Sequence, residues 1–250
     1  MSNFIKPSCD RKTRAYDNEF NTFGLMPGPD GSCPCATTGE GGCWNKPVGH
    51  RVNTCYVDRL MRCWSNLKKL LAHNTKLLMS STQQEMFKHL TGEFDRYVDT
   101  NSDRQQHPAY RIHWSGDIFS LAYACALKDA MSFYPFIKFW CYTRSLFAIP
   151  VLCDVPNLSL YISADPCNLR QAVDCYMKYK DKANTLNIAY MSDIHDFNQR
   201  LKYILKVRTK SILDMQLAAC PVDAGKLAID GGCNKCRMCI DGKKSVWFKT

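Results

Sequence analysis

Residues 110–117 read YRIHWSGD, a run of bulky and β-branched side chains that ends in a small polar cluster. Three later stretches repeat this design: IKFWCYTRS at 137–145, LSLYISAD at 158–165 and LNIAYMSD at 186–193. Short apolar runs bounded by turn-forming residues are typical of buried strands. The four stretches therefore predict four strands, and YILKVR at 203–208 is a further candidate.

Helix-compatible segments separate these strands, at 120–133 and at 166–182. Upstream, from Tyr56 to Leu90, apolar residues such as Leu60, Trp64 and Leu71 recur at helical spacing. Strands that alternate with helices form βα units and pair in parallel. The sequence therefore predicts an α/β fold whose parallel sheet forms an open or partial barrel.

The polar clusters all fall where a predicted strand ends. Parallel β/α folds build their active sites at that edge, because the loops that follow the strands converge there. Any single cluster has a simpler explanation as a turn or a helix cap, and Asp165 before PCNL fits the cap. Four in succession favour a mouth that faces a ligand; its residues are Ser115, Asp117, Thr143, Arg144, Ser163, Asp165, Ser192 and Asp193.

The composition allows one large domain or two small ones in 250 residues, with 46% hydrophobic and 12% aromatic side chains to fill a core. No run approaches the 18 apolar residues of a membrane span, and the first 20 residues lack the apolar segment of a secretory signal. We therefore expect a cytoplasmic protein that does not contact membranes.

The formal net charge of +10 favours a polyanionic partner such as nucleic acid or a nucleotide. The alternative is a basic surface that contacts only solvent, because lysines and arginines are spread along the chain. The sequence carries no Ser-His-Asp order, no phosphate-binding G-x-x-x-x-G-K-[ST] and no H-E-x-x-H. Hydrolase and kinase functions therefore lack their usual residues.

Fifteen cysteines stand in the chain, and their positions are uneven. Without a secretory signal, clustered thiols indicate metal ligands more than disulfides. Two groups crowd the ends of the chain. The middle ones lie singly in apolar or helical surroundings and are expected to be inert core residues: Cys125, Cys141, Cys153, Cys167 and Cys175.

At the C-terminal end, Cys233, Cys236 and Cys239 follow one another at C-x2-C-x2-C spacing. This is the rhythm of a ferredoxin-type ligand run, which a more distant Cys completes, and Cys220 before Pro221 fits that role. Structural zinc usually takes paired C-x2-C motifs instead. The spacing favours a four-cysteine [4Fe–4S] site and leaves zinc as the alternative metal.

The N-terminal group lies in residues 24–50, a long irregular stretch rich in Gly, Pro and Cys that a ligand is expected to order. Cys33, Cys43 and Cys55 are spaced C-x9-C-x11-C, which matches no compact finger. Three ligands would leave one iron of a [4Fe–4S] cluster open for chemistry. If Cys35 is the fourth ligand, the site is closed and structural.

Four stretches resemble the phage and bacterial family named gene product 88: RIHWSGDIFS, FIKFWCYTRSL, VPNLSLYISAD and NIAYMSD. That family has a strand ending in SGD, another ending in YT-[KR]-S, and a Pro-Asn lead into a third. The CPCAT, C and CYV of the N-terminal group and the final CP and C-x2-C-x2-C are similar to its cysteine runs. The resemblance covers most of residues 20–240 in the same order.

The resemblance implies a divergent relative of the radical S-adenosylmethionine (radical SAM) iron–sulfur enzymes. It implies a partial (β/α)6 TIM-like barrel over residues 1–210, with the Cys loop at 24–56, and a cluster-binding extension at 211–250. Cys33, Cys43 and Cys55 would hold an open [4Fe–4S] cluster, and the C-terminal four an auxiliary one. Ser115, Asp117, Thr143 and Arg144 would line the rim where S-adenosylmethionine or substrate binds. Asp117 and Arg144 are the catalytic candidates there, and Ser163 and Asp165 are further candidates for cofactor binding.

Three further assignments are made residue by residue. His113 points either into the barrel, as a catalytic group, or outward under a helix. Arg144 suits a clamp on phosphate or carboxylate, or else a salt bridge to Asp117 or Asp165. On the last candidate strand, Lys206 and Arg208 are expected to face an anionic substrate.

The leading hypothesis is a phage-encoded radical-SAM-like enzyme of the host cytoplasm. It would cleave S-adenosylmethionine reductively and then abstract hydrogen from a nucleotide or nucleic acid. The alternative is a non-catalytic module, stapled by iron–sulfur clusters or zinc, that binds nucleic acid or a host protein.

Overall fold

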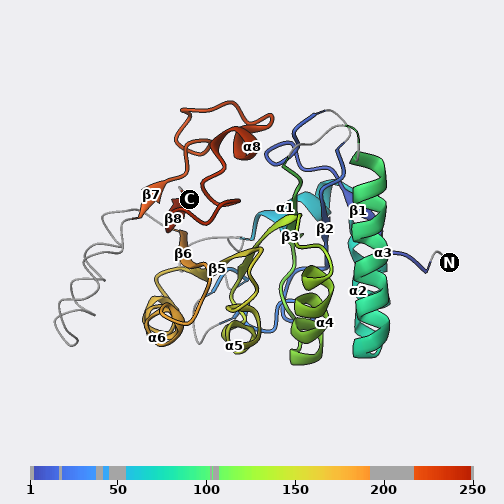
Figure 1. Ribbon diagram of the computed structural model, residues 1–250, viewed down its shortest axis with the longest axis horizontal. Helices are drawn as coiled ribbons and strands as arrows, with labels where there is room; N and C mark the ends of the chain where they lie inside the picture. The colour runs from blue at the N-terminus through green and yellow to red at the C-terminus, as the bar shows by residue number, and fades with distance from the viewer. Residues whose placement is uncertain are drawn as a thin grey trace.

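The computed structural model describes residues 3–16, 19–37, 42–44, 55–101, 103, 107–191 and 217–248. One eight-stranded sheet runs through it in the order β1-β2-β3-β4-β5-β6-β8-β7 (Figure 1). Among the strands of the described residues, only the β1–β2 pair is antiparallel, and every other pair is parallel. The strands are β1 Pro7–Ser8, β2 Thr22–Gly24, β3 Ala109–Ser115, β4 Lys138–Thr143, β5 Leu158–Ala164, β6 Leu186–Met191, β7 Ala218–Ala219 and β8 Val246–Phe248.

The helices cover the sheet and separate its strands. Figure 1 shows α3, α4, α5 and α6 in a row along one side of the sheet. None of the helices within the described ranges is long and apolar enough to cross a membrane. Their bounds are α1 Tyr56–Cys63, α2 Ser65–Met79, α3 Gln83–Asn101, α4 Leu121–Ser132, α5 Ile149–Leu152, α6 Leu169–Tyr179 and α8 Gly232–Cys236, with a 3-10 turn at Leu146–Ala148.

The predicted α/β class with parallel strands is confirmed. The four strands predicted from YRIHWSGD onward are β3 to β6, which pair in chain order. No strand pairs β1 with β7 across the two edges within the described residues, so the curvature of a partial barrel stays a prediction. The segment predicted as an extension, 211–250, contributes β7 and β8 to this same sheet.

The helical region predicted from Tyr56 to Leu90 is split into three helices. Helix α1 ends at Trp64, whose backbone is extended at φ −128° and ψ 90°, and α2 ends before Ser80. Leu71 and Leu78 are buried as the periodicity requires, whereas Leu60 and Trp64 are exposed. The apolar spacing therefore identified helical structure but overlooked its breaks.

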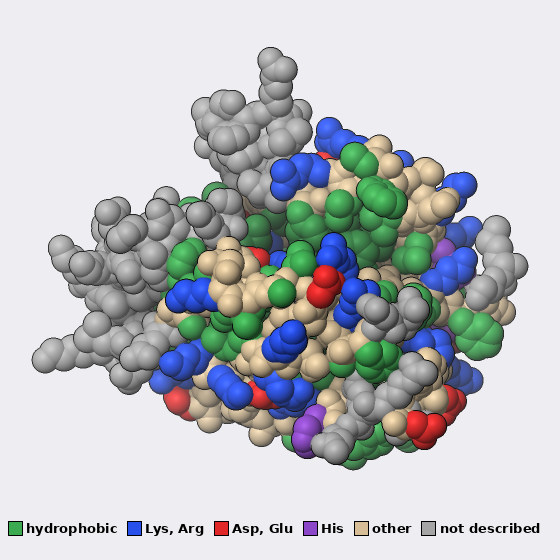
Figure 2. All heavy atoms as spheres, turned by 90° about the horizontal axis from the view of Figure 1, so that it is seen from above, with side chains coloured by type: hydrophobic (Ala, Val, Ile, Leu, Met, Phe, Trp, Pro, Cys, Tyr) green, Lys and Arg blue, Asp and Glu red, His purple; other side chains and the backbone are tan. Residues whose placement is uncertain are grey.

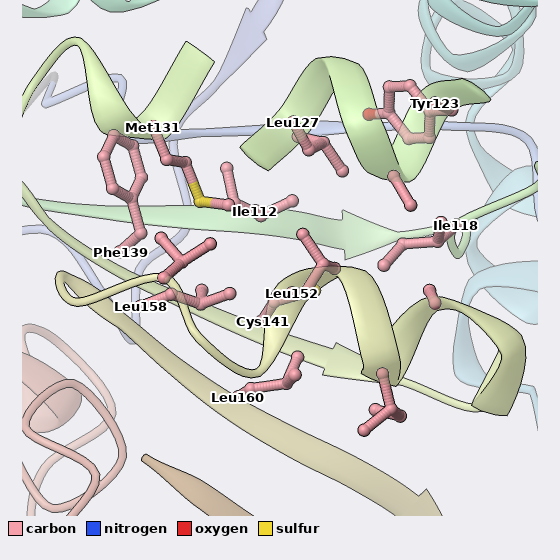
Figure 3. Close-up of a cluster of buried hydrophobic side chains, with 14 of the residues drawn as sticks. Ile112, Ile118, Tyr123, Leu127, Met131, Phe139, Cys141, Leu152, Leu158 and Leu160 are labelled. Atoms are coloured by element: carbon pink, nitrogen blue, oxygen red, sulfur yellow. The ribbon is translucent and has the colours of Figure 1, made fainter. Parts of the chain in front are cut away.

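Alternate residues of the central strands pack under the helices and form the main core. Ile112 of β3, Phe139 and Cys141 of β4, and Leu158 and Leu160 of β5 are all buried there. Figure 3 shows these side chains between the strands and the helices α4 and α5, together with Leu127, Met131 and Leu152. The period of two along each strand sends every other side chain to this layer.

The remaining side chains of β3 to β6 lie on what we call the second face of the sheet. There Tyr161 packs with Cys220 and Val246, and Trp140 packs with Ala109 and Ile240. Polar side chains of this face also bond the C-terminal segment: Ser159 Oγ donates to the Ile240 carbonyl at 2.8 Å, and Asn187 Nδ2 to the Gly242 carbonyl at 2.9 Å. The second face is therefore covered by the C-terminal segment.

The N-terminal segment 10–14 clasps the same C-terminal segment. The carbonyls of Arg11 and Lys12 accept hydrogen bonds from the amides of Gly231 and Cys233, both at 2.8 Å. We call residues 10–14 the strap. Its ion pairs to the C-terminal segment are Arg11–Asp230, Arg14–Asp230 and Lys12–Asp223.

Candidate functional site

Asp117 is the centre of the polar cluster at the carboxyl edge of the sheet. Its carboxylate accepts from Thr143 Oγ1 at 2.6 Å, from the Arg144 amide at 2.9 Å and from the Ile118 amide at 2.7 Å. Burial raises the pKa of Asp117 above its ordinary value, while these three hydrogen bonds favour the ionised form. Two of these hydrogen bonds therefore join the SGD turn after β3 to the YTRS turn after β4.

Arg144 extends this cluster toward β5. Its guanidinium pairs with Asp165 at 2.5 Å, and both side chains are largely buried. The Arg144 Nε is buried without a hydrogen-bond partner in the described part of the chain. The salt bridge to Asp165, one of the two roles predicted for Arg144, is therefore present, and the Nε–H group remains available to donate a further hydrogen bond. Asp165 also accepts from the amides of Cys167 and Asn168, so it caps the turn before α6 as well.

Ser32, which no sequence motif pointed to, joins the Cys loop to this edge. Its hydroxyl donates to the Met26 carbonyl at 2.8 Å and accepts from the Asp117 amide at 3.2 Å. Ser115 Oγ donates to the Leu25 carbonyl at 2.8 Å, so the end of β3 is bonded to the chain just after β2. The loop that carries Cys33 is therefore fixed against Asp117.

The three N-terminal cysteines lie in segments that are bonded to one another and to that edge. The Cys43 thiol bonds the Ala36 carbonyl, whose own amide bonds the Cys33 carbonyl, and the hydroxyl of Tyr56, next to Cys55, donates to the Trp114 carbonyl of β3. Burial raises the pKa of the Cys33 thiol well above its ordinary value, and the charges of Asp117, Cys43 and Cys55 add to the shift. Burial raises the pKa of Cys43 to about 11, with Arg144 opposing the shift and Cys55, Asp117 and Asp165 adding to it. The predicted thiols and the predicted edge residues thus meet in one place.

Cys35 has different surroundings. Burial raises the pKa of its thiol, as does Asp117, whereas a hydrogen bond with Ser145 and the charge of Arg144 lower it. Cys35 thus lies over the turn that follows β4.

The four C-terminal cysteines form the second set, beside the second face of the sheet. Burial raises the pKa of Cys233 to about 12 and of Cys239 to about 11, and each of the two is further raised by the charge of Cys220. Cys236 also acts on Cys239. Tyr142 and Cys239 pack against the same buried clusters of the second face, and the charge of Arg111 lowers the pKa of both Cys233 and Cys239.

No disulfide joins any two cysteines in the described part of the chain. Among the described residues, no group of three or more His, Cys, Asp or Glu side chains is drawn together tightly enough to hold a metal ion. The metal content of the two predicted ligand sets therefore stays a prediction.

His113 lies apart from the other predicted residues. It faces the helix layer, where its Nε2 is 2.6 Å from the Tyr123 hydroxyl of α4 and its ring meets Phe23 edge-on. Its φ of 57° is left-handed, and the β2–β3 register shifts between Thr22 and Gly24, so the strand bulges here. Burial lowers the pKa of His113 to about 3, so the ring is neutral. Of its two predicted orientations, the structure takes the one under a helix.

Some predicted residues lie outside the described residues. These are Ser192, Asp193, Lys206 and Arg208, with the candidate strand at 203–208. Ser163 lies in β5, next to its last residue. On the face seen from above in Figure 2, Lys and Arg side chains are spread among hydrophobic ones. Because Ser192 and Asp193 are not among the described residues, the edge site is seen without the residues that follow β6.

The comparison with known proteins agrees with the motifs just located. The family model described as gene product 88 matches residues 5–242. This chain belongs to the gene product 88 family. It is 30% identical over 262 residues to the Gene 88 protein of Mycobacterium phage L5, with 98% of each chain covered. It is 29% identical over 258 residues to the Gene 88 protein of Mycobacterium phage D29, again with 98% of each covered. No solved structure matches the chain.

Proposed function

We propose that this phage-family protein is an iron–sulfur protein with a radical-SAM-like site at the carboxyl edge of its sheet. The observation that carries the proposal is the meeting of Cys33, Cys43 and Cys55 with the Asp117–Arg144 cluster. The three cysteines follow β2, the first strand of the parallel series, as the family resemblance implies. A partial (β/α)6 curvature of the sheet belongs to the same proposal.

The donor sets fit iron–sulfur clusters better than zinc. Tetrahedral zinc with Zn–S bonds of 2.3 Å holds its sulfurs roughly 3.8 Å apart. In a [4Fe–4S] cluster each thiolate binds a different iron, so the thiols stand farther apart. The C-x2-C-x2-C spacing of Cys233, Cys236 and Cys239, with Cys220 as a fourth thiol, supports the larger group.

The surroundings of Cys35 support an open N-terminal set. Cys33 lies by Cys43 and Cys55, whereas Cys35 lies by Ser145; Asp117 and Arg144 act on both Cys35 and Cys43. Three ligands would then be Cys33, Cys43 and Cys55, and the C-terminal set would be closed by four. When bound, an open [4Fe–4S] cluster supplies an electron for the reductive cleavage of S-adenosylmethionine.

The chain's own residues would bind and orient the ligands of this site. The spare Nε donor of Arg144 suits a carboxylate or phosphate oxygen. Asp117 holds Arg144 in place through its backbone amide. A nucleotide or nucleic acid is the proposed substrate class, supported by the net charge of +10 and by phage relatives.

Iron and sulfide analysis of anaerobically purified protein tests the proposal. We expect a brown protein; Cys55→Ala and Cys236→Ala should each remove about half of the iron, since they belong to different four-iron clusters. Cys63→Ala is the matched control, because Cys63 is exposed at the end of α1 and should keep all iron.

The outcomes separate the alternatives. A colourless protein that holds only zinc would refute the iron–sulfur proposal. Loss of all iron from either variant would mean a single shared cluster. If iron-loaded, reduced protein never converts S-adenosylmethionine to 5′-deoxyadenosine, the enzyme hypothesis is refuted and the non-catalytic module is favoured. The C-terminal segment is hydrogen-bonded to the second face, which favours a structural role for its own thiols.

A further inference from the structure

Arg111 is a partly buried cation that the proposed catalytic site does not use. It lies in β3 on the second face, and its side chain is 18% exposed. Its Nη1 pairs with Asp10 of the strap at 2.9 Å, and its guanidinium carbon is 5.4 Å from the centre of the Tyr142 ring. Its Nε is buried with no hydrogen-bond partner among the described residues.

The side chain is placed against the C-terminal thiols. Its guanidinium lies over the Tyr142 ring, and Tyr142 and Cys239 both pack against the cluster around Tyr161. On the other side, the strap that holds its partner Asp10 accepts a hydrogen bond from the Cys233 amide at the Lys12 carbonyl. Two elements far apart in the sequence, β3 and the C-terminal segment, meet here over β4.

A plain structural role would be to anchor the strap through Asp10. That role accounts for one N–H group and leaves the Nε and the stacking on Tyr142 unexplained. Burying a guanidinium that has one partially buried carboxylate partner is costly unless more negative charge lies nearby. Four thiolates that share a metal cluster would supply that negative charge.

We propose that Arg111 is a positioning residue that fixes a positive charge beside the C-terminal thiolate set and raises the reduction potential of its cluster. This inference rests on the proposed function. A reduced cluster carries one more negative charge than an oxidised one, so a fixed cation favours reduction. Asp10 has the opposite effect, because its carboxylate offsets the guanidinium.

The test compares two variants that should shift the reduction potential of the C-terminal cluster in opposite directions. In Arg111→Gln the C-terminal cluster should become harder to reduce, with about a tenfold lower reduced fraction at fixed potential, or about 59 mV for a one-electron couple. In Asp10→Asn the cluster should become easier to reduce. Arg111→Lys keeps the charge and should stay near wild type. Arg11→Gln is the control, because it removes an exposed charge of the strap that pairs with Asp230.

The measurement is a redox titration of full-length, iron-loaded protein followed by electron paramagnetic resonance. The C-terminal signal is identified by its persistence in Cys55→Ala. An unchanged potential in iron-loaded Arg111→Gln overturns this inference alone, as does a shift of the same sign in Asp10→Asn, which would show a strap anchor. A protein without iron overturns this inference together with the proposed function. If Arg111→Gln does not fold, Asp10→Asn still decides by its sign.

Discussion

The N-terminal and C-terminal cysteine sets contain the same residue type in different surroundings. Around Cys33 and Cys43 lie the ionisable groups Asp117, Asp165 and Arg144, which end three neighbouring strands. Around Cys233 and Cys239 lie Arg111, Tyr142 and Tyr161, on the covered second face. Active sites of parallel β/α folds lie at the carboxyl edge of the sheet, whereas the C-terminal set belongs to a segment that is hydrogen-bonded to the second face. The difference makes the first set the candidate reagent and the second the candidate staple.

The largest effect is expected at Asp117, because the edge site depends on one carboxylate. Asp117→Ala leaves the Thr143 hydroxyl and the amides of Ile118 and Arg144 without their acceptor. We expect a loss of about 3 kcal/mol in the free energy of unfolding at pH 7. Urea unfolding measures this, and Ser163→Ala at the same edge should change stability by less than about 0.5 kcal/mol. Equal losses in the two variants would contradict the central role of Asp117.

A smaller and more local effect is expected at Tyr161, which bonds the C-terminal segment to the second face. Its hydroxyl donates to the Met238 carbonyl at 3.3 Å and to the Lys244 carbonyl at 3.1 Å. Tyr161→Phe should lower the opening free energy of residues 238–245 by about 1 kcal/mol, seen by amide hydrogen exchange.

Tyr134→Phe is the matched control, since the Tyr134 hydroxyl donates to Asp95 at 2.6 Å and to the Thr91 carbonyl on α3. It should loosen α3 and leave residues 238–245 protected. If Tyr161→Phe exposed the Cys loop as much as the C-terminal segment, the two sets would not be held independently.

The smallest effect is expected at Asp230, an exposed residue of the C-terminal segment that pairs with Arg11 and Arg14 of the strap. Hydrogen bonding to Arg11 holds the pKa of Asp230 down to about 2, below its ordinary value. A carboxyl with a lowered folded pKa stabilises above its unfolded pKa of about 3.9 and loses that stabilisation as pH falls toward 2. The urea midpoint of Asp230→Asn should thus lie slightly below wild type at pH 6 and merge with it near pH 2. A difference that persists at pH 2 would mean that packing, and not charge, holds the strap.

Much of the edge site was readable from the sequence because it follows strand ends. A buried strand and the polar residues after it are both predicted by each of the stretches YRIHWSGD, IKFWCYTRS and LSLYISAD. Parallel pairing then brings the ends of these strands to one edge of the sheet. Ser32 could not be found this way, since a serine in a loop gives no signal until the loop is folded against Asp117. The orientation of His113 was also undecided, because a bulge changes the alternation of side chains.

The sequence by itself determined the α/β class, the strands β3 to β6, the family and the two cysteine groups, because alternation and motif spacing are local properties of the chain. Tertiary structure alone decided which groups meet. It put Arg144 on Asp165, His113 under α4, the strap on the C-terminal segment and Arg111 beside Cys233. These contacts join residues far apart in the chain, and only the order of strands in the sheet sets their distances.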